Sequence, residues 1–171
     1  MKILNFLQTF QHRPVFSVAD VQKVYPGFDR KNLVRWQDKG LVQRIRNNWY
    51  VLPGKLKDES GLFSTANRIY SPSYVSLESA FSYYGWIPEG VFVITSITTQ
   101  KTAFFSSELG AFKYTNLKKS LFFGFEFPGN FSMAEPEKAL LDFIYLHPEL
   151  YDPITFEELR WYPDVIMSKI T

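Results

Sequence analysis

Arginine, lysine and asparagine side chains gather in two short stretches of the first third of the chain. The first stretch contains Arg30, Lys31, Asn32, Arg35 and Lys39. The second is Arg44-Ile45-Arg46-Asn47-Asn48. Guanidinium groups pair bidentately with guanine and asparagine amides with adenine, whereas basic side chains also contact phosphates. These residue types therefore predict contact with double-stranded DNA.

The charge of the whole chain is distributed unevenly between its two parts. Residues 1–57 contain eleven Lys and Arg against three acidic residues, a formal charge of +8, and residues 58–171 contain eight against fourteen, a charge of −6. Such asymmetry is typical of a basic module that binds a polyanion, joined to an acidic module with a different role. The alternative is that the basic side chains only solvate an ordinary helix surface.

Local signals predict three short helices in the basic part. Ile3, Leu4, Leu7 and Phe10 recur at helical spacing, and Pro14 ends that helix. Ser17 and Asp20 form a variant of the capping box, ahead of a second helix that buries Val18, Val21 and Val24 and ends at Pro26-Gly27.

Asp29 caps a third helix over residues 30–39, in which Leu33 and Trp36 face inward and Gly40 takes the left-handed position after the last turn. Two β-prone runs, LVQRIR (41–46) and WYVL (49–52), flank Asn47-Asn48 and predict a tight hairpin with a left-handed turn. Trp36 is expected in the core, whereas Trp49 is either a core residue or a platform for stacking bases.

Three helices followed by a hairpin predict a winged helix-turn-helix over residues 1–53. In such a module the third helix enters the major groove and the hairpin contacts the backbone or the minor groove. The predicted DNA-binding residues are Arg30, Lys31, Asn32, Arg35, Lys39, Arg44, Arg46, Asn47 and Asn48.

A linker over residues 54–61, rich in polar residues and helix breakers, separates this module from a second domain over 62–171. Its patterns predict helices around 65–70, from 74 to 86 with Ser76 as the cap and Gly85 at the end, and from 135 to 146. Strands are expected at 91–95, 101–105, 112–114 and 121–127. The fold class is therefore α+β, with a mostly antiparallel sheet in the second domain.

Several kinds of chemistry find no support in the composition. The chain has no cysteine and two histidines far apart in sequence, which argues against thiolate or multi-histidine metal sites. Ser76 and Ser79 lack a nearby histidine base, no glycine-rich phosphate loop is present, and Glu135 and Glu137 flank Pro136 where acids favour a helix start. With no apolar run of eighteen residues, we expect a cytoplasmic protein without catalytic activity, cofactor or membrane partner.

Segments of both modules resemble the AbiEi family of antitoxins from type IV, abortive-infection toxin–antitoxin systems. The resemblance rests on YVSLESA (74–80) with Gly85, the strand at 91–95, and AEPEKALLD (134–142). The hairpin RIRNNWYVLP (44–53) also resembles the wing of that family, which commonly has glycine where Asn48 stands. The similarity covers about residues 1–146, in the order of the family. Family members often continue with further helices, so the second domain is expected to be shortened at its C-terminus.

The resemblance implies an N-terminal winged helix that represses its own operon and a C-terminal domain that counteracts a nucleotidyltransferase-like toxin, without requiring a stable complex between the two proteins. Two alternatives remain open from the sequence. One is a nuclease or nucleotide-processing enzyme that uses carboxylates such as Glu78, Glu135, Glu137 and Asp142. The other is an adaptor whose winged helix binds protein.

Overall fold

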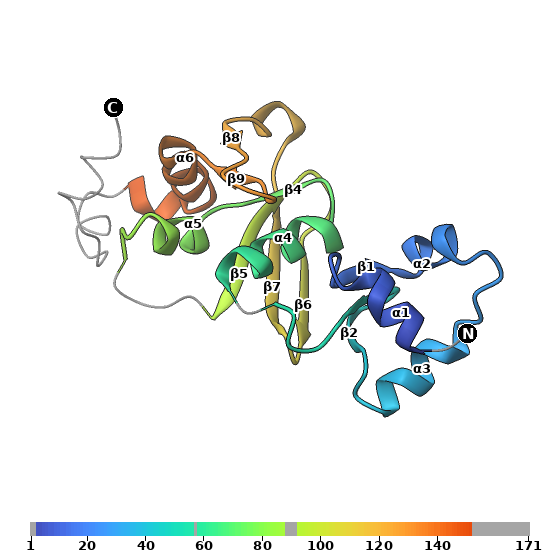
Figure 1. Cartoon of the computed structure of the whole chain (residues 1–171). Helices are drawn as coiled ribbons and strands as arrows, with labels where there is room; N and C mark the ends of the chain where they lie inside the picture. The colour runs from blue at the N-terminus through green and yellow to red at the C-terminus, as the bar shows by residue number, and fades with distance from the viewer. Residues whose placement is uncertain (1–2, 57, 88–91, 152–171) are drawn as a thin grey trace.

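The computed structural model describes residues 3–56, 58–87 and 92–151, which form a mixed α+β structure. Figure 1 shows a small helical part with a short sheet, which contains the N-terminus, beside a larger part built on a second sheet. The end of the predicted second domain, residues 152–171, lies outside the described residues.

The first part consists of helices α1 (Ile3–Phe10), α2 (Val18–Val24) and α3 (Lys31–Asp38) and strands β1 (Val15–Ser17), β2 (Gln43–Arg46) and β3 (Trp49–Val51). The predicted capping box is confirmed: the Asp20 amide donates to Ser17 Oγ (3.0 Å), and the Ser17 amide donates to Asp20 Oδ2 (2.8 Å). Gly40 has the expected left-handed backbone, with φ of 66°.

An aromatic core holds the three helices together. Phe6 and Phe10 of α1 pack with Phe16, Phe28 and Trp36, and the rings of Phe6 and Trp36 lie 4.7 Å apart between centroids. Such aromatic pairs contribute about 0.5–1.5 kcal/mol beyond their buried area. Leu4 and Val24, predicted on the buried faces, are instead 67% and 50% exposed, because each of these short helices buries only a narrow stripe.

Strand β1 was not predicted, because three residues between Pro14 and a helix cap are too few to establish a period-two pattern. It pairs antiparallel with β3, and β3 pairs antiparallel with β2, giving the order β1-β3-β2. The turn between β2 and β3 is the predicted hairpin, and Asn48 has the left-handed φ of 64° that such a turn requires.

Both faces of this small sheet are buried. Phe16 and Leu52 face the helical core, whereas Val15, Ile45 and Val51 belong to the hydrophobic core of the second part. Successive side chains of a strand point to opposite faces, so the sheet is shared between the two cores. The two parts are therefore joined by packing as well as by the chain.

The second part begins with α4 (Glu59–Ile69), whose first turn lies inside the predicted linker and is capped by Asp58. It continues with β4 (Ser73–Val75), α5 (Glu78–Tyr83), β5 (Val93–Thr98), β6 (Ala103–Ser107), β7 (Gly110–Asn116), a 3-10 turn η1 (Lys119–Leu121), β8 (Phe125–Glu126), β9 (Met133–Ala134), α6 (Pro136–Leu146) and a 3-10 turn η2 (Pro148–Tyr151). The sheet order is β6-β7-β5-β4-β9-β8. In Figure 1, α4 lies across this sheet, and the Tyr114 hydroxyl of β7 donates to the Ala66 carbonyl of α4 (2.7 Å).

The second sheet is mixed. Three of its strand pairs are antiparallel, but β5–β7 and β4–β9 are parallel. The long run 121–127 contains only the two-residue strand β8, and Phe123 and Phe127 are exposed. Over the described ranges, no helix has the length and apolar character needed to cross a membrane.

The segment 74–86 also differs from the prediction. Its first residues form strand β4, and the helix begins only at Glu78, after Leu77 with φ of 59°. Ser76 is therefore not the cap; its hydroxyl donates to buried Asp142 Oδ2 (3.0 Å). The Ser76 hydroxyl thus binds Asp142, which is distant in the sequence, instead of capping the helix as the local pattern predicted. Gly85 follows the helix with φ of 72°, as predicted.

Candidate nucleic-acid interface

Helix α3 is fixed to the first part by its two inward residues. Leu33 and Trp36 are buried, and the Trp36 ring packs against Phe6 and Phe28. The N-cap is Arg30, without a side-chain cap bond, and not the predicted Asp29; Asp29 Oδ1 nevertheless accepts a hydrogen bond from the Lys31 amide (2.9 Å), which satisfies one of the free amides of the first turn. The predicted inward face of α3 is confirmed, and the orientation of the helix follows from it.

The opposite side of α3 carries the predicted basic residues. Arg30, Lys31, Arg35 and Lys39 are exposed, as is Val34 between them, and Asn32 is half-buried. Over the residues that the structure describes, none of these four basic side chains forms an intramolecular ion pair. The helix and its two flanking residues therefore present four cationic side chains to solvent, together with Val34, Gln37 and one acid, Asp38, on a rigid support.

The tip of the hairpin adds a second group of polar side chains. Arg44 is exposed, and its guanidinium reaches Asn47 Oδ1 and the Arg46 carbonyl, both at 3.4 Å. Asn47 and Asn48 are exposed at the turn. Arg44, Asn47 and Asn48 thus remain available to a partner.

Arg46 lies on the other side of the hairpin. The strand register shifts between Arg44 and Arg46, so Arg44 pairs with Tyr50 and Arg46 with Trp49. A bulge of this kind turns the following side chain to the opposite face. The Arg46 guanidinium donates to the Ile69 carbonyl (2.8 Å) and lies over the Phe105 ring at 4.1 Å, so the half-buried side chain contacts the second part.

Trp49 is half-buried against the core of the second part, and the Arg68 guanidinium lies 5.9 Å from its ring. Of the two roles considered for Trp49, packing therefore agrees with its position. The register shift at Ile45 decides the position of Arg46 and cannot be read from the alternation of residues in 43–46. Arg68, at the junction of the two parts, was not among the predicted site residues, because an isolated arginine in a helix carries no sequence signal.

Two of the segments that carry the family resemblance, 74–80 and 134–142, meet in the core of the second part. Asp142 of α6 accepts hydrogen bonds from the Tyr74 hydroxyl (2.8 Å) and the Ser76 hydroxyl (3.0 Å) and pairs with Lys138 one turn earlier. Burial raises the pKa of Asp142 and outweighs the opposing effect of Lys138 and the two hydroxyls. Burial and the neighbouring Asp142 likewise raise the pKa of Tyr74.

All four side chains of this network are closed to solvent. A buried, mutually satisfied polar network of this kind fixes one packing arrangement. These contacts hold β4 and the residue after it against α6, so the network has a structural role.

The remaining carboxylates that could serve an enzyme lie at helix ends. Glu135 and Pro136 start α6, with Glu137 in its first turn, and Glu78 starts α5. Among the residues described, no group of three or more His, Asp and Glu side chains is arranged to hold a metal ion. The confirmed placement at the helix starts agrees with the interpretation of Glu135 and Glu137 as favouring the helix dipole.

Neither protein-family models nor curated proteins match this chain in a direct comparison.

Proposed function

We propose that the protein is a transcriptional autorepressor that binds double-stranded DNA through an N-terminal winged helix-turn-helix, and that it serves as the antitoxin of a type IV toxin–antitoxin system. In this proposal α2 and α3 form the helix-turn-helix, α3 enters the major groove, and the β2–β3 hairpin is the wing.

The observation that carries the DNA-binding proposal is the division of α3 into two faces. Leu33 and Trp36 anchor one face in an aromatic core, while Arg30, Lys31, Arg35 and Lys39 are exposed without intramolecular ion pairs in the described chain. A recognition helix needs this combination of rigid support and free donors, because its side chains must reach base edges in a fixed register. Arg44, Asn47 and Asn48 would contact phosphates or the minor groove beside it.

Arg46 is left out of the proposed surface, because its guanidinium already contacts Ile69 and Phe105. The order α1-β1-α2-α3-β2-β3, with a three-stranded sheet, supports the winged-helix interpretation of the first part.

The antitoxin role rests on the resemblance to the AbiEi family. The hydrogen bonds of Tyr74 and Ser76 to Asp142, which pairs with Lys138, join two of its segments, 74–80 and 134–142, in one buried network. The proposed target is a nucleotidyltransferase-like toxin, counteracted without a requirement for a stable complex. Co-expression with the nucleotidyltransferase-like toxin proposed as its target tests the role: rescue of growth supports it, and growth arrest despite normal levels of this protein contradicts it.

The DNA-binding proposal is tested by fluorescence anisotropy with the upstream promoter duplex and a scrambled duplex of equal composition, each at two salt concentrations. We expect tighter binding to the promoter and a marked loss of affinity at higher salt, because each neutralised phosphate releases counterions. Arg35→Ala should weaken promoter binding by roughly 1–3 kcal/mol if Arg35 reads a base.

Lys113→Ala is the matched control, because Lys113 is an exposed cation on β7 in the second part. It removes one positive charge and should leave promoter affinity nearly unchanged. Equal affinity of the wild type for promoter and scrambled duplexes would contradict sequence-specific repression. Absence of salt-dependent binding to either duplex would favour the protein-binding adaptor.

A further inference from the structure

A cleft of about 460 Å³ lies at the junction of the two parts of the chain. One wall is the segment between α1 and β1, with His12, Arg13 and Pro14, and the other is the face of α4 that bears Ser64, Thr65 and Arg68. Small-molecule sites typically have volumes of roughly 300–1,000 Å³, so the cleft is large enough for a ligand of nucleotide size.

Where the structure describes the chain, the charged groups that line the cleft are all cationic. Arg13 and Arg68 face it from its two walls, and none of the described residues that line it is Asp or Glu. In the part of the chain that the structure describes, Arg13 has no carboxylate within salt-bridge distance. Two guanidiniums thus share a concave site without an anion to neutralise both.

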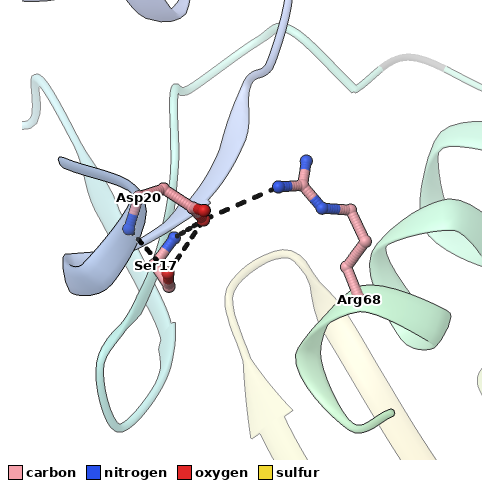
Figure 2. A network of polar contacts seen from close by, with 3 residues as sticks. All are labelled: Ser17, Asp20 and Arg68. Atoms are coloured by element: carbon pink, nitrogen blue, oxygen red, sulfur yellow. Dashed lines mark hydrogen bonds and ion pairs between the residues drawn. The ribbon is translucent and has the colours of Figure 1, made fainter. Parts of the chain in front are cut away.

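Among the described residues, Arg68 has one acidic neighbour, Asp20, which already accepts hydrogen bonds from Ser17. Figure 2 shows Arg68 reaching from α4 toward Asp20, whose carboxylate binds the amide and hydroxyl of Ser17. The Arg68–Asp20 separation is 3.7 Å, beyond the 2.7–2.9 Å of a charge-assisted hydrogen bond. Within the described ranges the Arg68 guanidinium donates no hydrogen bond to protein, although its side chain is only 34% exposed.

The electrostatic situation of Arg68 agrees with a missing anion. Partial burial lowers the pKa of Arg68, the Asp20 charge raises it, and the like charge of Arg13 lowers it further. A group with a half-buried positive charge, a like-charged neighbour and unused donors gains most from a ligand that supplies negative oxygens.

We propose that this cleft binds a small phosphate monoester of mononucleotide size, with its phosphate between Arg13 and Arg68. Planar guanidiniums bind phosphate oxygens bidentately, and the Ser64 hydroxyl in the same wall is a further donor. Pro14, Val15 and Leu56 supply an apolar side for the organic part of the ligand. The site is separate from the α3 surface and goes beyond the proposed DNA binding.

Isothermal titration calorimetry of the full chain with AMP, inorganic phosphate and adenosine tests the proposal. We expect saturable binding of one AMP, weaker binding of inorganic phosphate and none of adenosine, because the phosphate supplies the charge recognised. Arg13→Gln should weaken AMP binding roughly tenfold or more, since it removes a charge-assisted contact.

Lys113→Gln is the matched control, as it removes an equal charge from the exposed surface of β7 and should keep wild-type affinity for AMP. Arg68→Lys retains the charge but loses the planar fork, and should fall between Arg13→Gln and the wild type. Thermal melts of each variant verify that the fold persists.

Equal heats from AMP and adenosine, or unchanged AMP affinity in folded Arg13→Gln, would overturn the proposal. So would a result in which Arg13→Gln weakens binding of a DNA duplex while neither AMP nor phosphate binds the wild type, because the cleft would then serve a DNA phosphate. The AMP titrations contain no DNA, so their outcome is independent of the promoter experiment.

Discussion

Arg44 and Arg46 stand two residues apart in the same hairpin strand, and the structure predicts opposite consequences for their replacement by alanine. The Arg44 side chain is exposed and near the turn, whereas the Arg46 guanidinium contacts the second part. We expect Arg46→Ala to reduce the stability of the protein with little effect on DNA binding. Arg44→Ala should do the reverse.

The expected loss in Arg46→Ala follows from its contacts. A hydrogen bond from a charged donor contributes about 1.5–3 kcal/mol, here from the guanidinium to the Ile69 carbonyl, and a cation–π contact about 0.5–2 kcal/mol, here with Phe105. Arg46 Nε is buried without a hydrogen-bond partner among the described residues, and its desolvation offsets part of this gain. We therefore expect a net loss of about 2 kcal/mol, or a decrease of about 4–8 °C in Tm for a chain of this size.

Two assays separate the variants. Thermal and urea unfolding should show the loss for Arg46→Ala and a change within about 0.5 kcal/mol for Arg44→Ala, as for other exposed substitutions. Promoter titrations at several salt concentrations, well below both Tm values, should show a slope reduced by about one for Arg44→Ala if it contacts a phosphate, and an unchanged slope for Arg46→Ala.

Equal stability of the two variants would refute the inward placement of Arg46. A salt slope lowered equally in both would refute the division of the hairpin into a DNA-facing side and a side that packs on the second part. Arg46→Lys offers a further comparison, because it keeps the charge but not the planar group over Phe105, and should be intermediate in stability.

Three further predictions concern the fold. Asp142→Ala leaves the Lys138 ammonium buried without its carboxylate and should lower the free energy of unfolding by about 3–5 kcal/mol in urea, whereas Lys138→Met with Asp142→Leu should restore most of it. Burial raises the pKa of Asp20, but hydrogen bonds from Ser17 and the charges of Arg68 and Lys23 outweigh this and lower it from its ordinary value of 3.8. The contribution of Asp20 to stability is therefore present above about pH 4 and lost as the pH falls through the lowered pKa; Asp20→Asn should show a smaller acid-induced loss, and an identical pH profile would contradict this. Asn48→Val should lower stability by about 1–2 kcal/mol because of the positive φ, while Asn48→Gly should not, as unfolding curves of the two will show.

Local interactions explain why parts of the first module could be predicted. The Ser17–Asp20 capping box, the left-handed Gly40 and the Asn47-Asn48 turn each depend on residues within about four positions of one another. The inward positions of Leu33 and Trp36 follow from helical spacing. Such features need no distant partner, so residue type and order were sufficient to determine them.

Tertiary contacts decided the features that the pattern missed. Ser76 leaves its predicted capping role because Asp142, sixty-six residues later, accepts its hydroxyl. The parallel pairs in the second sheet, the bulge that turns Arg46 inward and the cleft between Arg13 and Arg68 all bring together residues far apart in the chain or depend on strand register.

The sequence by itself determined the helices and hairpin of the basic part, the exposed cations of α3 and the uneven distribution of charge. Only the tertiary structure determined that Arg44 of the hairpin stays exposed whereas Arg46 contacts the second part. The physical reason is that helical periodicity is a local property, whereas the partner of a buried charge is set by packing, because a charge leaves water only where groups from elsewhere in the fold compensate it.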